Sequence, residues 1–79
     1  MVSEFTAIFE KDGDWRVGFV EELPSANTQG ATLEEARENL KEAIVLIIET
    51  NRELAELEVA GRSVIKEQLI VSVQSSGGT

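Results

Sequence analysis

The fold is decided by residues 5–20, FTAIFEKDGDWRVGFV, in which bulky side chains recur at alternate positions on both sides of an Asp-Gly pair. A period of two residues is typical of half-buried strands. The stretch therefore predicts a β-hairpin, with strands at residues 5–9 and 15–20.

The turn of this hairpin can be placed in two ways. A two-residue turn at Asp-Gly sets Phe9 opposite Arg16. A three-residue loop, residues 11–13 with Gly13 left-handed, gathers the apolar side chains on one face, and a one-residue slip would turn them to the wrong face. We therefore predict the bulged hairpin, which pairs Phe9 with Trp15, Ala7 with Val17 and Phe5 with Phe19.

The segment after the hairpin predicts a short strand and then a turn. Pro24 lacks a backbone donor and holds Leu23 extended, so the second strand should end before it. Residues 26–29 are expected to form a short third strand at the sheet edge, and Gly30 then lets the chain turn.

A long helix is predicted from Thr32 onward. Thr32 and Glu35 are spaced as a capping box, in which each side chain accepts from the other residue's backbone N–H. Apolar residues then recur at helical spacing to about residue 59, where Gly61 provides a stop, and Asn51 suggests a bend or break. The apolar stripe consists of Leu33, Ala36, Leu40, Ile44 and Ile47, widened by Ala43, Leu54 and Ala55.

Residues 64–73 predict a last strand, with Leu69, Val71 and Val73 on one face and Ile70 on the other. The fold class is therefore α+β, with the order β-β-β-α-β and one long helix covering one face of an antiparallel sheet. We expect a single domain over residues 1–73 and a disordered Gly/Ser tail over residues 74–79.

The helix carries a second apolar surface. Val45 and Leu46 point away from the stripe, so residues 43–48 are apolar around most of the circumference. Scattered surface hydrophobes are one interpretation. The other, which we favour for so small a domain, is a homo-oligomer interface at Val45, Leu46 and Ile48.

Composition excludes several functions. The 79 residues include 15 acidic and 7 basic side chains, for a net charge of −8, and neither cysteine nor histidine is present. Thiolate and Ser-His nucleophiles, zinc-cysteine sites and disulfides are therefore excluded. The charge opposes direct nucleic-acid binding and favours either solubility or a basic protein partner.

Acidic pairs suggest no metal or cofactor. Asp12 and Asp14 flank Gly13, but their spacing is not that of a calcium loop and Asp is common in turns. The N-terminus has no signal-peptide pattern, and the apolar run of residues 43–48 is too short to span a membrane. We expect a cytoplasmic protein without cofactors.

Several short motifs together resemble the N-terminal domain of HicB-like antitoxins. They are Phe5-Thr6-Ala7-Ile8-Phe9-Glu10, Asp12-Gly13-Asp14-Trp15, Glu22-Leu23-Pro24, Thr28-Gln29-Gly30, Thr32-Leu33-Glu34-Glu35-Ala36 and Asn39. The resemblance covers residues 5–73. It departs from the family at Ser25, where Gly is usual, and at Ala31, where Asp commonly precedes the capping Thr.

The resemblance implies a partial ribonuclease-H-like fold, in which the last strand returns beside the first. It also implies a function, the neutralisation of a small basic HicA-type ribonuclease toxin by covering its active site. Many members add a C-terminal DNA-binding segment. Because this chain ends in a Gly/Ser tail, we expect no direct nucleic-acid binding.

Acidity and exposure mark two loops as candidate partner-binding regions. Their residues are Asp12, Asp14, Trp15, Glu21, Glu22, Leu23 and Pro24. An interaction module of the same fold without a toxin partner is the alternative. A metal-dependent nuclease using these acids is disfavoured, because residues 6–8 of the first strand offer no carboxylate to the sheet centre.

Overall fold

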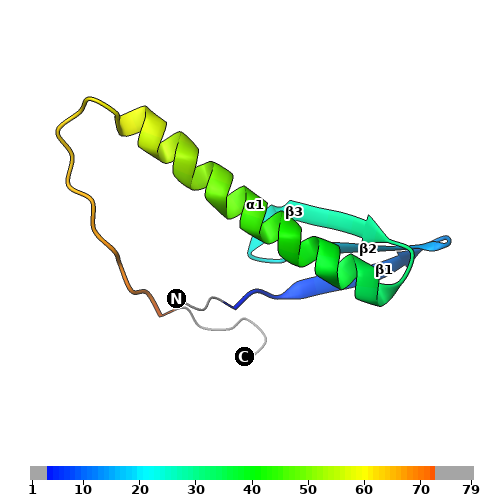
Figure 1. The fold of residues 1–79 in the computed structure, drawn as a ribbon. Coiled ribbons are helices and arrows are strands. Elements are labelled where there is room, and N and C mark those ends of the chain that lie inside the picture. The colour runs from blue at the N-terminus through cyan, green and yellow to red at the C-terminus, as the bar shows by residue number, and fades with distance from the viewer. Residues whose placement is uncertain (1–3, 73–79) are drawn as a thin grey trace.

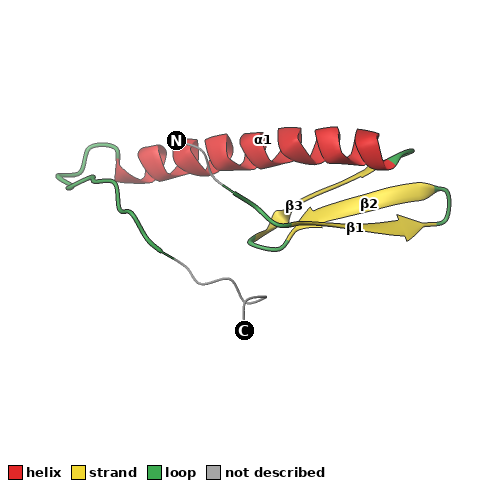
Figure 2. Cartoon of the chain, turned by 90° about the horizontal axis from the view of Figure 1, so that it is seen from below, coloured by secondary structure: helices red, strands yellow, loops and turns green. Residues whose placement is uncertain are grey.

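A computed structural model describes residues 4–72 and confirms an α+β fold of three strands and one helix. The strands are β1 (Ala7–Asp12), β2 (Trp15–Val20) and β3 (Leu23–Gly30), and the helix is α1 (Leu33–Val59). The sheet is antiparallel with the order β1-β2-β3, and α1 lies across one of its faces (Figures 1 and 2). The tail expected at residues 74–79 lies outside the described residues.

The hairpin forms, but neither register predicted from the sequence is correct. Asp12 pairs with Trp15, so Gly13 and Asp14 form a two-residue turn and Phe9 lies opposite Gly18. Gly13 has a φ of 61°, and a glycine with positive φ at the first central position suits a type II′ turn.

Packing explains the register. A Cβ on Gly18 would lie 2.8 Å from two carbons of the Phe9 ring, so the glycine leaves room for the ring on the helix side of the sheet. Val20 then faces the helix and is fully buried. Since side chains alternate along a strand, the bulky set of β2, Trp15, Val17 and Phe19, turns to the opposite face.

The third strand is longer than expected and includes Pro24. Val20 pairs with Leu23 but Phe19 pairs with Asn27, so residues 24–26 bulge out of the ladder. Pro24 is tolerated there because it lies in a bulge of an edge strand, where no ladder donor is required. The bulge directs Ala26 into the core, where it is fully buried.

The helix begins at Thr32 as predicted, but only one of the two capping-box hydrogen bonds forms within residues 4–72, since the Glu35 carboxylate accepts no bond from the Thr32 N–H. Thr32 Oγ1 accepts from the Glu35 backbone N–H at 3.1 Å. The helix then runs unbroken through Asn51 to Val59, so the break considered there does not occur. Gly61, with a φ of 79°, follows the helix end and turns the chain away.

The hydrophobic core is small and lies under the first half of α1. Val20, Ala26, Ala36 and Leu40 are its buried hydrophobic residues. Partly buried side chains surround them, namely Phe5, Phe9, Leu23, Ile44 and Ile47. A 27-residue helix is about 40 Å long, whereas the eight residues of β3 span about 26 Å, so the second half of α1 extends past the sheet (Figure 2).

The last strand expected beside the first is absent from the described chain. Residues 64–72 are exposed and carry no strand pairing. The helix overhang explains this, because the chain leaves α1 beyond the sheet and runs back clear of it (Figures 1 and 2). The radius of gyration is accordingly 16.0 Å, against about 12 Å for a compact domain of this length.

Candidate protein-binding surface

The two loops predicted to bind a partner do not form one site. Asp12, Asp14 and Trp15 lie at the hairpin tip, whereas Glu21 to Pro24 lie at the other end of β2. A six-residue strand separates them by roughly 20 Å. A single compact epitope cannot include both loops without also including the strand between them.

Glu22 has a structural role. Its carboxylate accepts from the Thr6 backbone N–H at 2.7 Å and from Thr6 Oγ1 at 2.6 Å. The neighbouring Glu21 N–H donates to the Thr6 carbonyl at 2.9 Å. These bonds hold the β2–β3 loop against the start of β1, so the Glu22 carboxylate is already engaged within the chain.

The hydrogen bond from the Thr6 hydroxyl, followed by that from the Thr6 backbone N–H, lowers the pKa of Glu22 below its ordinary value. A carboxylate with a lowered folded-state pKa stabilises the fold above its unfolded-state pKa, and this contribution is lost as the pH falls through the folded-state value.

We expect Glu22→Gln to lower the thermal midpoint at pH 7, and the deficit to shrink steadily below about pH 4.5. Thermal melts of both proteins over pH 3–7 measure this.

The matched control is Glu21→Gln, which changes the adjacent carboxylate and leaves both Thr6 bonds in place. A deficit for Glu22→Gln that stays constant down to pH 3 would contradict the role assigned to the Thr6 bonds.

The sheet face away from α1 carries several large apolar side chains. We call it the open face. Its centre consists of Ile8, Trp15, Val17 and Phe19, of which Ile8 and Phe19 are direct cross-strand partners. Trp15 is 49% exposed and Phe19 is 37% exposed, although both sit in a regular strand. A group of large side chains left in water makes this face a candidate interaction site.

Polar side chains border the open face on both sides. Glu10 and Asp12 of β1 pair with Val17 and Trp15, which brings two carboxylates to one border. On the other border Asn27 pairs with Phe19 and Gln29 pairs with Val17. A shallow hollow of about 450 Å³ runs between the β2 and β3 side chains. An apolar centre with a polar border is the usual anatomy of a protein–protein interface.

The register predicted from the sequence set Trp15, Val17 and Phe19 on the same face as Phe9, because β2 alternates acceptably in either frame. Trp15, Val17 and Phe19 are bulkier than Arg16, Gly18 and Val20, so bulk alone favours the wrong face. Gly18 was the available signal, since a glycine within a strand often marks the close approach of another group. Here that group is the Phe9 ring.

The oligomer surface predicted on α1 is partly exposed to solvent. Val45 and Leu46 are 54% and 64% exposed, whereas Ile48 is half-buried. A shallow hollow beside them is also lined by charged residues, Lys41, Glu42 and Glu49. Their role as an interface stays a prediction, tested below beside a second candidate.

Within residues 4–72 no three acidic side chains come close enough together to hold a metal ion. The acids proposed for a nuclease are accordingly dispersed, with Asp12 and Asp14 at the hairpin tip and Glu22 bonded to Thr6. The described helix has no segment that is both long and apolar enough to cross a membrane.

Three relatives described as UPF0150 proteins are similar to this chain. The one from Archaeoglobus fulgidus is 36% identical over 64 residues, 80% of this chain and 93% of that protein. The Synechocystis relative is 46% identical over 56 residues and is covered to 75%. The Thermotoga maritima relative is 47% identical over 47 residues, and the chain spans 63% of its length. No family model and no solved structure matches the chain.

Proposed function

Since the chain belongs to the UPF0150 family, we propose that it is an antitoxin-like module that acts by binding protein. Its target would be a small basic HicA-type toxin that cleaves mRNA. The module would neutralise this toxin by covering its active site, with no catalytic step of its own.

The open face is the observation that carries this proposal. It presents Ile8 on β1 and Trp15, Val17 and Phe19 on β2, two hydrogen-bonded strands of the sheet, so the side chains are held in place before a partner arrives. Aromatic residues on a rigid support supply a large contact area at a small entropic cost, and they are enriched at interface centres.

Charge supports a basic target. Glu10 and Asp12 border the open face, Asp14 lies in the adjacent turn, and the whole chain carries a charge of −8. Opposite potentials on two proteins speed encounter and suppress wrong partners. A surface that presents carboxylates beside an apolar centre could also occupy the positive groove in which an RNA phosphate would bind.

The motifs that resemble HicB-like antitoxins lie on the same elements. Asp12-Gly13-Asp14-Trp15 forms the tip beside the open face, and Thr28-Gln29-Gly30 ends β3 on its other side. The Thr32 motif instead starts the helix, where it serves the fold. The family resemblance and the exposed surface therefore coincide at the hairpin and the edge strand.

The test is co-expression with the small basic protein encoded by a neighbouring reading frame, followed by co-purification and an RNA-cleavage assay. We expect a stable complex and suppressed cleavage at equimolar antitoxin. A basic ribonuclease neighbour that neither binds nor is inhibited would overturn the antitoxin proposal and favour an interaction module with another partner.

A further inference from the structure

The outer edge of β1 is open to another strand. Among residues 4–72 the strand order is β1-β2-β3, so β1 has β2 as its one described neighbour. The Thr6 carbonyl accepts from Glu21, so even-numbered positions of this strand direct their backbone groups toward β2. By the alternation of an antiparallel ladder, Ala7, Phe9 and Lys11 direct their N–H and C=O groups outward. Such an edge is a template for strand addition.

An apolar groove lies beside this edge, on the helix side of the sheet. It has a volume of about 350 Å³ and is lined by Phe5, Ala7 and Phe9 from below and by Leu40 and Ile44 from α1. Arg37 and Lys41 form its basic rim. A strand added to β1 would direct every second side chain into this groove.

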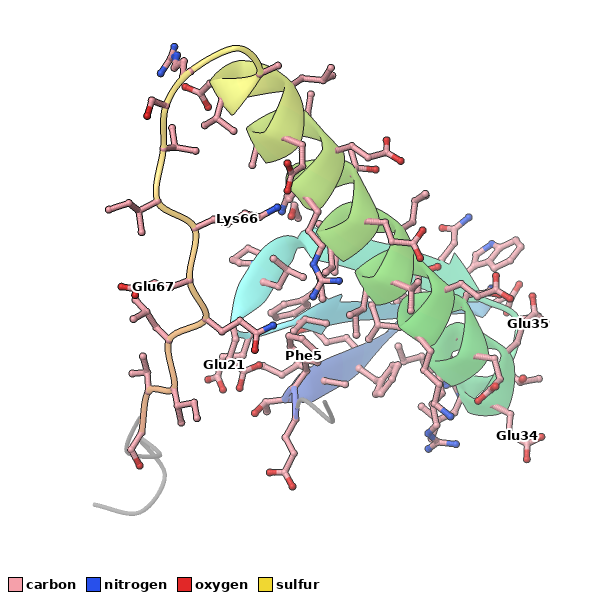
Figure 3. The ribbon with its side chains drawn as sticks, turned by 60° about the vertical axis from the view of Figure 1, so that its left-hand side comes forward. Phe5, Glu21, Glu34, Glu35, Lys66 and Glu67 are labelled. Carbon is pink, nitrogen blue, oxygen red and sulfur yellow. The ribbon has the colours of Figure 1, made fainter. Side chains whose placement is uncertain are left out.

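The chain contains a segment with the properties of such a strand. We call residues 64–72, VIKEQLIVS, the arm. The arm is exposed throughout, with Ile65 at 93%, Ile70 at 95% and Leu69 at 76%. It is rich in β-branched residues and contains no glycine or proline, which favours a strand. In Figure 3 the Lys66 side chain points from the arm toward α1. It forms an exposed ion pair with Glu56 of the helix.

The small core indicates that the arm must be covered. Four fully buried hydrophobic residues are few even for a short domain, and chains of this size usually need a further source of stability. Seating Leu69 and Val71 in the β1 groove would bury the arm and enlarge the core at the same time.

We propose that the arm adds to β1 of a second copy of the chain, antiparallel to it, so that two copies exchange arms. Antiparallel pairing of Leu69 with Phe9 sets Val71 beside Ala7, Ile70 beside Ile8 and Glu67 beside Lys11. Apolar residues meet apolar residues, and Glu67 meets Lys11, which lies on the same face of the sheet as the groove that Arg37 and Lys41 help to line.

The direction of the arm relative to β1 differs between pairing with a second copy and pairing within the same chain. The arm leaves α1 past the Ala7 end of β1, so an arm that returned within its own chain would run parallel to β1 (Figure 2). Parallel pairing that seats Leu69 and Val71 in the groove places Glu67 beside Phe5 instead of Lys11, so Glu67 loses its cross-strand cation. Charge complementarity therefore favours the exchanged, antiparallel arm.

The first test is the mass in solution. We expect the wild-type protein to sediment as a dimer and Leu69→Glu to raise the dimer dissociation constant by about 100-fold or more, because two arms per dimer each lose a buried side chain. Ile65→Glu is the matched control, since Ile65 is equally apolar and exposed but falls opposite Gly13, beyond β1. It should leave the dimer intact.

Two further sets of variants test the Glu67–Lys11 pair and the alternative interface on α1. Lys11→Glu should weaken the dimer, and Lys11→Glu combined with Glu67→Lys should restore it. Val45→Glu with Leu46→Glu, on the helix surface predicted from the sequence, should leave the dimer intact. A dimer that the helix variant dissociates and Leu69→Glu does not would overturn arm exchange.

Cross-linking locates the arm directly, because the chain has no cysteine of its own. Glu10 and Gln68 become a non-hydrogen-bonded pair in the proposed register, with Cα atoms about 4.5 Å apart, within disulfide range. Mixing Glu10→Cys with Gln68→Cys and oxidising should give a cross-linked dimer. Absence of this product, or a monomer in sedimentation of the wild type, would contradict the proposal. Both tests are independent of toxin binding.

Discussion

Replacing Leu40 with alanine is expected to unfold a large share of the protein at 37 °C. Leu40 is 2% exposed, and Leu40 and Val20 are the two largest fully buried side chains of the described residues. Leu→Ala in a core costs about 2–5 kcal/mol, and small domains have total stabilities at the low end of about 5–15 kcal/mol. Urea unfolding followed by circular dichroism at 222 nm measures the loss.

Leu46→Ala is the control for this substitution. It makes the same chemical change on the same helix at a side chain that is 64% exposed, so we expect a change within about 0.5 kcal/mol. Equal losses for both variants would show that the core does not lie where α1 crosses the sheet. Both are to be measured at the same protein concentration, because self-association adds to apparent stability.

Gly30→Ala is expected to be the second strongly destabilising change. A Cβ at Gly30 would lie 2.6 Å from the Ala36 backbone nitrogen and 3.1 Å from its Cα. Both atoms belong to the first turns of α1, so the helix start would have to move away from β3. Overpacking of this kind costs about 1–3 kcal/mol or more when backbone must shift. The thermal midpoint should fall by roughly 10 °C.

Gly18→Ala provides the comparison. Its Cβ would meet carbons of the Phe9 side chain at 2.8 Å, and a side chain can rotate where a helix backbone cannot. We therefore expect a smaller fall in the thermal midpoint than for Gly30→Ala. The reverse order would contradict the close approach of α1 to the end of β3.

The parts of the fold that depend on neighbouring residues could be predicted from the sequence. The Thr32 cap and the helix to Val59 follow from local spacing, and both are present. The hairpin register could not be predicted, because it depends on whether Gly18 or Val17 faces a helix that comes later in the chain. The prediction of a last strand was wrong within the described chain. The residue pattern indicates that the segment could form a strand, but it does not indicate which sheet edge the segment would pair with.

The candidate site shows the same division. Acidity drew attention to the hairpin tip, which borders the open face at Asp12 and Trp15, and its role in partner binding stays a prediction. It also drew attention to Glu22, whose carboxylate is engaged by Thr6. The open face itself was missed, because the predicted register set Val17 and Phe19 on the same face as Ala7 and Phe5. Only the packing of Phe9 over Gly18 shows which face of β2 remains uncovered.

The most direct test of the proposed function is the affinity of the open face for a basic toxin from the neighbouring reading frame, measured by titration calorimetry. Phe19→Glu changes the centre of the open face, and Leu57→Glu makes a similar change at a 72% exposed side chain near the end of α1. We expect Phe19→Glu to weaken binding about 100-fold or more and Leu57→Glu to leave it within about threefold. Equal affinities for wild type and Phe19→Glu, with the fold intact, would contradict the open face as the binding surface.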